Sequence, residues 1–236
     1  MKKLMSESSN PLYAQLMDQI KTDINRGLYP VGSRIPPEHA LVDNYNVSRV
    51  TVRRALSELT SEGLLERKQG KGTFVSAPKI MQDIKNIHSF HESCKKNGCI
   101  PGTKVLLVHE IKADALDIHE LNLNKDASVI ETIRVMYADH DAVVLETNHF
   151  SMAYAYLEDS DLTGSLYGTL HEFGIVPARA THEISICKAN DYQADLLNIE
   201  QGTALLRLRE VVYDQKGRPL HNSLQLIRGD RFIFRI

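Results

Sequence analysis

Residues 45–56 read Tyr-Asn-Val-Ser-Arg-Val-Thr-Val-Arg-Arg-Ala-Leu, and this segment is the most informative one about the structure of the N-terminal third of the chain. Asn46 predicts a turn. Ser48 predicts a helix start, because a serine hydroxyl there accepts an otherwise unpaired backbone N–H. We expect the helix to run from Arg49 to Glu62 and to stop at Gly63. Its apolar face follows the helical period and consists of Val52, Ala55, Leu56 and Leu59.

The exposed start of this helix has the composition of a DNA-reading surface. Arg49 and Arg53 lie four residues apart, so they project from the same face, with Thr51 and Arg54 beside them. Arginine can bond two acceptors on a guanine edge, and Ser or Thr suits base edges and phosphates, so the mix fits a helix in the major groove. Taken alone, the helix has a simpler alternative, which is an ordinary solvated face.

Two more helices are predicted upstream. Asn10 is a good N-cap, and Pro11 is favoured in a first turn. A short second helix is expected from Pro37 to Tyr45. The first helix should end at Gly27, and its apolar face repeats every four residues at Leu12, Leu16, Ile20 and Ile24.

Downstream of the reading helix, residues 64–76 predict a hairpin with a basic tip. Two extended runs flank Gly70-Lys71-Gly72. A phosphate-cradling P-loop is excluded, because its spacing is absent and no helix follows. Three helices, a short turn and a basic hairpin in this order favour a winged helix-turn-helix DNA-binding domain over residues 1–76.

The composition is that of a globular protein with a local basic footprint. The 236 residues suffice for one or two domains, and 42% hydrophobic with 25% charged residues argues against wholesale disorder. The net charge is −2, but residues 1–76 carry 11 Lys and Arg against 8 Asp and Glu, while the remainder carries 17 against 22. The basic excess therefore lies where DNA binding is predicted.

We expect a cytoplasmic protein with no membrane association, no metal and no cofactor. The first ten residues lack the apolar core of a secretory signal, and no stretch approaches the ~20 apolar residues that span a bilayer. Three cysteines, Cys94, Cys99 and Cys187, have the spacing of neither a zinc site nor a redox pair. Reduced thiols are the expectation for them.

Four motifs carry a resemblance to a known family. They are Ile35-Pro36-Pro37-Glu38, residues 45–56, Glu62-Gly63-Leu64-Leu65, and residues 69–75, which read Gln-Gly-Lys-Gly-Thr-Phe-Val. Together they resemble the winged helix of the GntR family of regulators and cover nearly all of residues 10–76.

The resemblance implies a role for each matching residue. Arg49 and Arg53 would read bases, Ser48 and Thr51 would contact phosphates, and Gly70 with Lys71 would enter the minor groove. Arg54 lies beside these residues in the predicted DNA surface. The chain departs from the family pattern at His39, where many members carry an arginine that contacts the DNA backbone.

The rest of the chain predicts a connection and an α+β domain. Residues 77–88 mix polar and apolar groups without a clear period, so we expect them to link the two domains. Over residues 89–236, strand-like segments dominate, with hairpins at Asp139-His140-Asp141 and at residues 215–219. Antiparallel hairpins with helices around them indicate an α+β fold.

A second resemblance lies in this region. Its motifs are residues 131–139, Glu146-Thr147, residues 164–167, residues 202–206 and residues 228–232. They resemble the UTRA effector domain, which marks the HutC-type branch of the GntR family. The resemblance implies a chorismate-lyase-like antiparallel sheet with peripheral helices, a homodimer and a pocket for a small molecule.

By this resemblance Arg134, Ser165 and Tyr167 match positions that hold an anionic group, often a sugar phosphate. Glu146 matches a position that bonds the polar head of the ligand, and Arg228 is expected to line or brace the pocket. Physically, Ser165 would open a helix whose N–H groups attract anions, and Arg134 would supply a bidentate fork.

Two positions depart from the sensor pattern. Met136 stands where sugar-phosphate sensors often have a second arginine, and Asn222, which we also place in the pocket, stands where several carry Glu. The ligand is then either a monoanion or a neutral sugar, or Arg207 or Arg209 substitutes for the missing cation. The alternative for Arg134 and Glu146 is a plain cross-strand salt bridge.

An enzyme is the rival hypothesis, because the implied fold is that of a lyase and the chain has ten histidines. The histidines show no metal-binding spacing, and no nucleophile elbow or glycine-rich cofactor loop is present. We therefore predict a transcriptional regulator, a repressor rather than an enzyme, that binds a near-palindromic double-stranded operator as a homodimer. Its effector would be a sugar phosphate, an amino sugar or a related metabolite.

Overall fold

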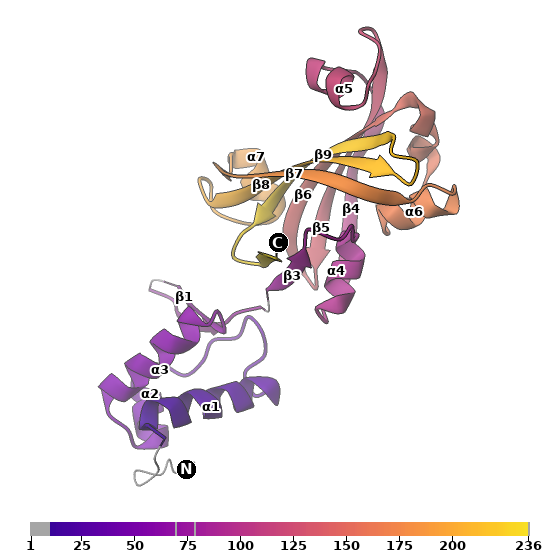
Figure 1. Cartoon of the computed structure of the whole chain (residues 1–236). Coiled ribbons are helices and arrows are strands. Elements are labelled where there is room, and N and C mark those ends of the chain that lie inside the picture. Colours follow the sequence, from indigo (N-terminus) through magenta and orange to yellow (C-terminus); the bar gives the residue numbers. More distant parts are fainter. Residues whose placement is uncertain (1–9, 69, 78, 236) are drawn as a thin grey trace. The chain divides into compact units, whose positions relative to one another are not determined.

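The computed structural model describes residues 10–68, 70–77 and 79–235. The chain forms two compact units, Met1–Pro78 and Lys79–Ile236 (Figure 1). Within the described residues, no helix has both the length and the apolar character needed to cross a bilayer.

The N-terminal unit is three helices and a two-stranded hairpin. Its core contains Leu16, Ile20, Leu41, Leu56 and Leu59, so the apolar faces predicted for the first and third helices are the buried ones. The elements are α1 (Leu12–Asn25), α2 (Glu38–Tyr45), α3 (Arg49–Ser61), β1 (Leu65–Lys68) and β2 (Gly72–Val75). The predicted winged helix-turn-helix is confirmed, although the N-cap position of α1 is Pro11 rather than Asn10.

Local backbone chemistry sets the turns of this unit. Asn46 ends α2 in the left-handed conformation (φ 51°), which lets the chain reverse before α3. Gly72 has φ 122°, and a Cβ there would lie 2.5 Å from Nε of Arg34. The positive φ favours glycine at this end of the hairpin tip, and a larger residue would also displace the end of the Arg34 side chain.

The C-terminal unit is built on a six-stranded antiparallel sheet in the order β4-β5-β6-β9-β8-β7. This confirms the predicted α+β class. The strands are β4 (Pro101–Lys112), β5 (Ser128–Ala138), β6 (Asp141–Ser151), β7 (Pro177–Lys188), β8 (Ala204–Asp214) and β9 (Pro219–Arg228).

Strand register divides the polar residues between the two faces of the sheet. Arg134 pairs with Glu146, which pairs with Gln225 on β9. Glu131 pairs with His149, which pairs with Asn222. Because successive side chains point to opposite faces, positions three apart on one strand lie on opposite sides. The first row and the second row therefore belong to different faces.

Short helices surround the sheet. In Figure 1, α5 stands at the end of the sheet that lies farthest from α4 and β3. Clusters of apolar residues pack around η1 and α6, and others pack around α7. The helices are α4 (Phe90–Lys96), α5 (Ala115–Glu120), the 3-10 helix η1 (Met152–Asp159), α6 (Leu166–Glu172) and α7 (Asp191–Leu197).

One strand lies inside the segment that we predicted as a connection. Within residues 77–88, β3 (Ile80–Asp83) pairs in parallel with β10 (Phe232–Arg235) at the end of the chain. Ile80 and Phe232 are buried in one cluster with Met136 and Val144. A partner at the opposite end of the chain leaves no local pattern, which is why periodicity did not reveal this strand.

Candidate functional site

The start of α3 is fixed by the cap that the sequence predicted. The Thr51 backbone N–H donates to Oγ of Ser48 at 3.1 Å, and the two hydroxyl oxygens lie 2.9 Å apart. An N-cap of this kind stabilises a helix by about 1 kcal/mol. The first turn of α3 therefore holds its side chains in a defined position.

The three arginines of α3 have different surroundings. Arg49 and Arg53 are both exposed. Nε of Arg53 donates to Glu38 at 2.8 Å, and this contact raises the pKa of the guanidinium. Arg54 is also exposed, but its Cζ lies 3.8 Å from the centre of the Tyr13 ring on α1.

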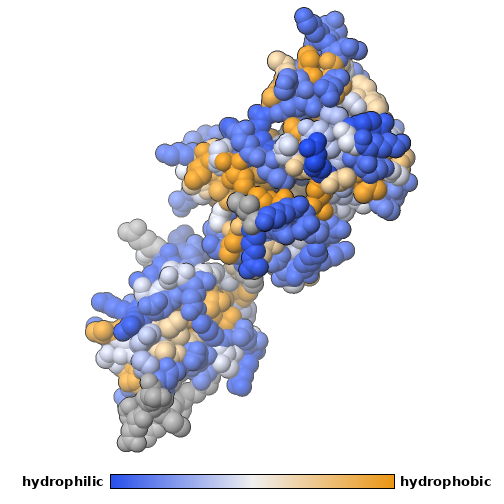
Figure 2. Space-filling view, in the orientation of Figure 1, coloured by the Kyte–Doolittle hydropathy of each residue, from blue (hydrophilic) through white to orange (hydrophobic). Residues whose placement is uncertain are grey.

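The hairpin tip lies beside the start of α2. One surface hollow is lined by Glu38 and by Gly70 and Gly72 of the tip, with Arg34, Arg67 and Lys68 around it. Lys71 and His39 are both exposed, and Gly70 has φ 70°. In Figure 2 the side chains that this unit presents are mainly hydrophilic, with smaller apolar areas between them. Gln69 lies outside the described residues.

The C-terminal unit contains a polar cavity on one face of the sheet. Its wall includes residues 86–91, which follow β3 and open α4, together with side chains from β5 to β9 and α6. Arg134, Glu146 and Tyr167 all line it, as the sequence predicted them to line one pocket. The cavity volume is about 50 Å³, which is room for a few waters, so a sugar-sized ligand needs side chains to move.

A buried ion pair forms part of the cavity wall. Nε of Arg134 donates to Oε2 of Glu146 at 2.9 Å, its Nη2 bonds the same oxygen, and its Nη1 lies 3.4 Å from the carbonyl oxygen of Leu162. The two side chains are 3% and 8% exposed. The cross-strand salt bridge considered as an alternative is thus present, but it is buried, where breaking it is costly.

Three of the predicted ligand residues lie outside the cavity wall. Ser165 caps α6 by accepting from the backbone N–H of Gly168 at 3.2 Å, and it borders a separate, shallow hollow. Arg228 pairs with Asp230 at 2.7 Å. Nδ2 of Asn222 donates to Asp117 at 2.9 Å on the opposite face of the sheet.

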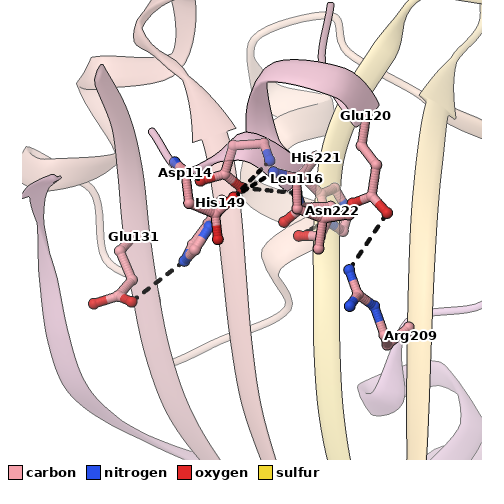
Figure 3. A network of polar contacts seen from close by, with 9 residues as sticks. Asp114, Leu116, Glu120, Glu131, His149, Arg209, His221 and Asn222 are labelled. Atoms are coloured by element: carbon pink, nitrogen blue, oxygen red, sulfur yellow. Dashed lines mark hydrogen bonds and ion pairs between the residues drawn. The ribbon is translucent and has the colours of Figure 1, made fainter. Parts of the chain in front are cut away.

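The network around Asn222 attaches α5 to the sheet (Figure 3). Asp117 of α5 accepts from Asn222 and lies 2.8 Å from Nδ1 of His149, whose Nε2 lies 3.3 Å from Glu131. Arg209 contacts Glu120 at 3.4 Å on the same side. Neither Arg207 nor Arg209 belongs to the cavity wall, so neither replaces the arginine that is absent at Met136.

Several polar residues of the cavity were missed in the sequence. His182 on β7 lies 2.7 Å from Glu210 on β8, and this contact raises the pKa of His182. Glu210 also accepts from Gln225 at 2.7 Å. His91 and His221 line the same cavity. Their spacing along the chain carried no signal, because strand pairing rather than sequence proximity brings them together.

An exposed arginine-bearing helix beside a basic hairpin in one unit, and a polar cavity in the other, define a ligand-responsive DNA-binding regulator. Residues 12–75 match the family model described as bacterial regulatory proteins, gntR family, and residues 96–233 match the UTRA domain. The chain belongs to the GntR family and carries a UTRA effector domain. It is a transcriptional regulator and not an enzyme, with DNA binding in the first domain and effector binding in the second.

Relatives and solved structures agree with this assignment. The chain is 32% identical to the HTH-type transcriptional repressor NagR of Bacillus subtilis, over 97% of this chain and 95% of that protein. It is 31% identical to a probable fructoselysine utilization operon transcriptional repressor of Escherichia coli, over 95% and 93%. The crystal structure of PhnF from Mycobacterium smegmatis matches with a TM-score of 0.71 and 29% identity, over 95% of this chain and 97% of that one.

Proposed function

We propose that this chain is a homodimeric repressor that binds a near-palindromic operator and whose binding is controlled by a small polar effector in the UTRA cavity. The observation that carries the DNA half is the exposure of Arg49 and Arg53 at the capped start of α3. Similar proteins named as repressors support the direction of regulation.

Each DNA contact follows from the chemistry of its residue. Arg49 and Arg53 read base edges in the major groove, where an arginine can bond two acceptors of one guanine. Ser48, Thr51 and His39 contact the phosphate backbone. Lys71 and Gly70 enter the minor groove at the hairpin tip, and the lack of a side chain at Gly70 permits close approach.

The test of this assignment is Arg49→Ala, measured on an operator selected from a pool of random duplexes with the wild-type protein. We expect a loss of about 1–3 kcal/mol in operator binding and a relaxed preference at one base pair. Arg26→Ala, an exposed arginine at the end of α1, is the matched control and should bind as wild type. Unchanged operator affinity in Arg49→Ala would refute the assigned role.

The geometry of operator reading supports homodimerisation. Two reading helices of a dimer contact half-sites separated by about 34–36 Å, one turn of DNA. On this chain β7 is an edge strand of the sheet, and Ile186 on it is 75% exposed. An apolar side chain on an unpaired edge is a candidate contact for a second copy.

Ile186→Lys tests that contact by analytical ultracentrifugation. We expect the dimer to dissociate at concentrations where the wild type stays associated. Ile100→Lys is the control. Ile100 has nearly the same exposure, 74%, but directly precedes β4, which is the edge strand on the other side of the sheet. Equal dissociation of both variants, or of neither, contradicts a dimer built on β7.

The effector is proposed to be an amino sugar, a sugar phosphate or a related metabolite. Arg134, Glu146 and Tyr167 line a cavity rich in hydrogen-bonding groups, as a polar ligand requires. One relative is named for the utilization of fructoselysine and another for the transport and metabolism of mannosyl-D-glycerate, and both compounds are sugar conjugates. A thermal-shift screen of such compounds, followed by operator release, tests the class.

A further inference from the structure

The cavity wall of the C-terminal unit contains a buried histidine, His221, with one ring nitrogen that has no hydrogen-bond partner among the described residues. His221 on β9 is 2% exposed, and its ring centre lies 4.8 Å from that of Phe150 and 6.1 Å from that of Tyr167. Its Nδ1 lies 3.2 Å from the carbonyl oxygen of Asn222, while its Nε2 is buried with no hydrogen-bond partner among the described residues.

The tautomer of this histidine follows from that contact. A carbonyl oxygen only accepts, so Nδ1 carries the proton and Nε2 presents a lone pair. Burial lowers the pKa of His221 to about 4, so the ring is neutral near pH 7. Nε2 is then a buried acceptor without a donor, and leaving such a group unpaired is unfavourable.

Other buried polar groups lie on this face of the sheet. Arg134 is engaged through Nε and Nη2 by Glu146 and through Nη1 by Leu162. Asn148, opposite Ser223 on β9, donates from Nδ2 to Glu146 at 2.8 Å, while its own Oδ1 is buried without a partner. A ligand group that approaches Nε2 of His221 therefore meets a lone pair, with the Glu146 carboxylate in the same wall.

We infer that the effector bonds Nε2 of His221 through a hydroxyl or amino group, so that the part of the ligand at this wall is a neutral or cationic hydrogen-bond donor and not a phosphate. An anion placed against Nε2 would meet its lone pair, whereas a sugar hydroxyl or amine would satisfy the buried nitrogen. The inference rests on the cavity being the effector site, as proposed above. It assigns His221 as a residue that determines ligand specificity.

The first test needs no ligand. Long-range ¹H–¹⁵N spectra of the full chain labelled on histidine nitrogen, with His221→Phe to assign the signal, report the tautomer directly. A neutral Nδ1–H ring at pH 7 is expected. An Nε2–H tautomer or an imidazolium at that position overturns the inference, because neither offers an acceptor.

The second test separates ligand binding from structure. The probes are hexoses, hexosamines and their phosphates, each with analogues in which one hydroxyl is replaced by fluorine, which does not donate. For the probe that stabilises the wild type, we expect one fluorine position to weaken binding about 5- to 150-fold, the range of an unpaired buried acceptor. The same fluorine should change binding to His221→Phe little.

Two further measurements distinguish a failure of the assigned role of His221 from a failure of the proposed effector class. His221→Phe without ligand should be at least as stable as wild type, because it removes an unpaired polar atom, and His221→Gln should restore part of the binding through its own acceptor. Full sensitivity to fluorination in His221→Phe overturns the role of His221. A panel in which no compound stabilises the wild type contradicts the proposed effector class, while the tautomer still decides the chemistry of His221.

Discussion

Replacing Arg134 with Met should strongly destabilise the C-terminal unit, because it leaves the Glu146 carboxylate buried without its cation. In the wild type this arginine bonds Glu146 through Nε and Nη2, and the two side chains are 3% and 8% exposed. After the substitution, Nδ2 of Asn148, at 2.8 Å, is the donor to the carboxylate that remains among the described residues. Met retains most of the apolar volume, so the charge is the main change.

The magnitude follows from the burial of the pair. Removing one partner of a buried ion pair costs about 3–5 kcal/mol, since the remaining charge keeps its desolvation penalty. For a unit the size of Lys79–Ile236, each kcal/mol shifts the Tm by about 2–4 °C. A fall of about 6–20 °C in the Tm of this unit is therefore expected.

Calorimetry measures this change, and a double variant provides the control. Arg134→Met combined with Glu146→Leu removes both charges, and replacing a whole buried pair with apolar side chains is often neutral. The double variant should recover most of the lost Tm, while operator binding by the N-terminal unit stays intact in both proteins at low temperature. A loss below about 1 kcal/mol in the single variant, or no recovery in the double variant, would show that the pair is not the buried unit described here.

Two other predictions concern the hairpin and the buried histidine. Gly72→Ala places a Cβ 2.5 Å from Nε of Arg34 at φ 122°, so the Arg34 side chain must move at the hairpin tip, and we expect a lower operator affinity and a lower Tm of the N-terminal unit. Gly32→Ala is the control, because Gly32 has positive φ but open space around it, and this variant should lower only the Tm. Equal operator affinity of the two variants contradicts the steric argument. Burial lowers the pKa of His221 to about 4 in the folded chain, against 6.5 in the unfolded chain. Because the unfolded state binds the proton first as the pH falls, the free energy of unfolding decreases between pH 6.5 and pH 4, by up to about 3 kcal/mol. The charges that act on it are Glu146 and Arg134, and His221→Phe should lack this part of the acid destabilisation in urea titrations; parallel pH profiles would contradict it.

The N-terminal unit shows how far local sequence reaches. Ser48 was recognised as a cap, and the bounds of α3 agree with the prediction to within one residue at its end. The partners were not predictable: Glu38 bonds Arg53, and Tyr13 packs under Arg54. These contacts join separate helices, and the spacing of residues within one helix says nothing about them.

Local patterns were enough to predict the helices of the winged domain, most strands of the second domain and the residue types of a polar pocket, because caps, glycines and periodicity act over a few neighbouring residues. Long-range contacts were needed to pair β3 with β10, to turn Asn222 toward α5 instead of the cavity, and to bring His182, Glu210 and His221 into the wall with Arg134. Those outcomes depend on strand register, which places side chains from distant segments on one face, and a shift of one residue would turn each of them to the other side.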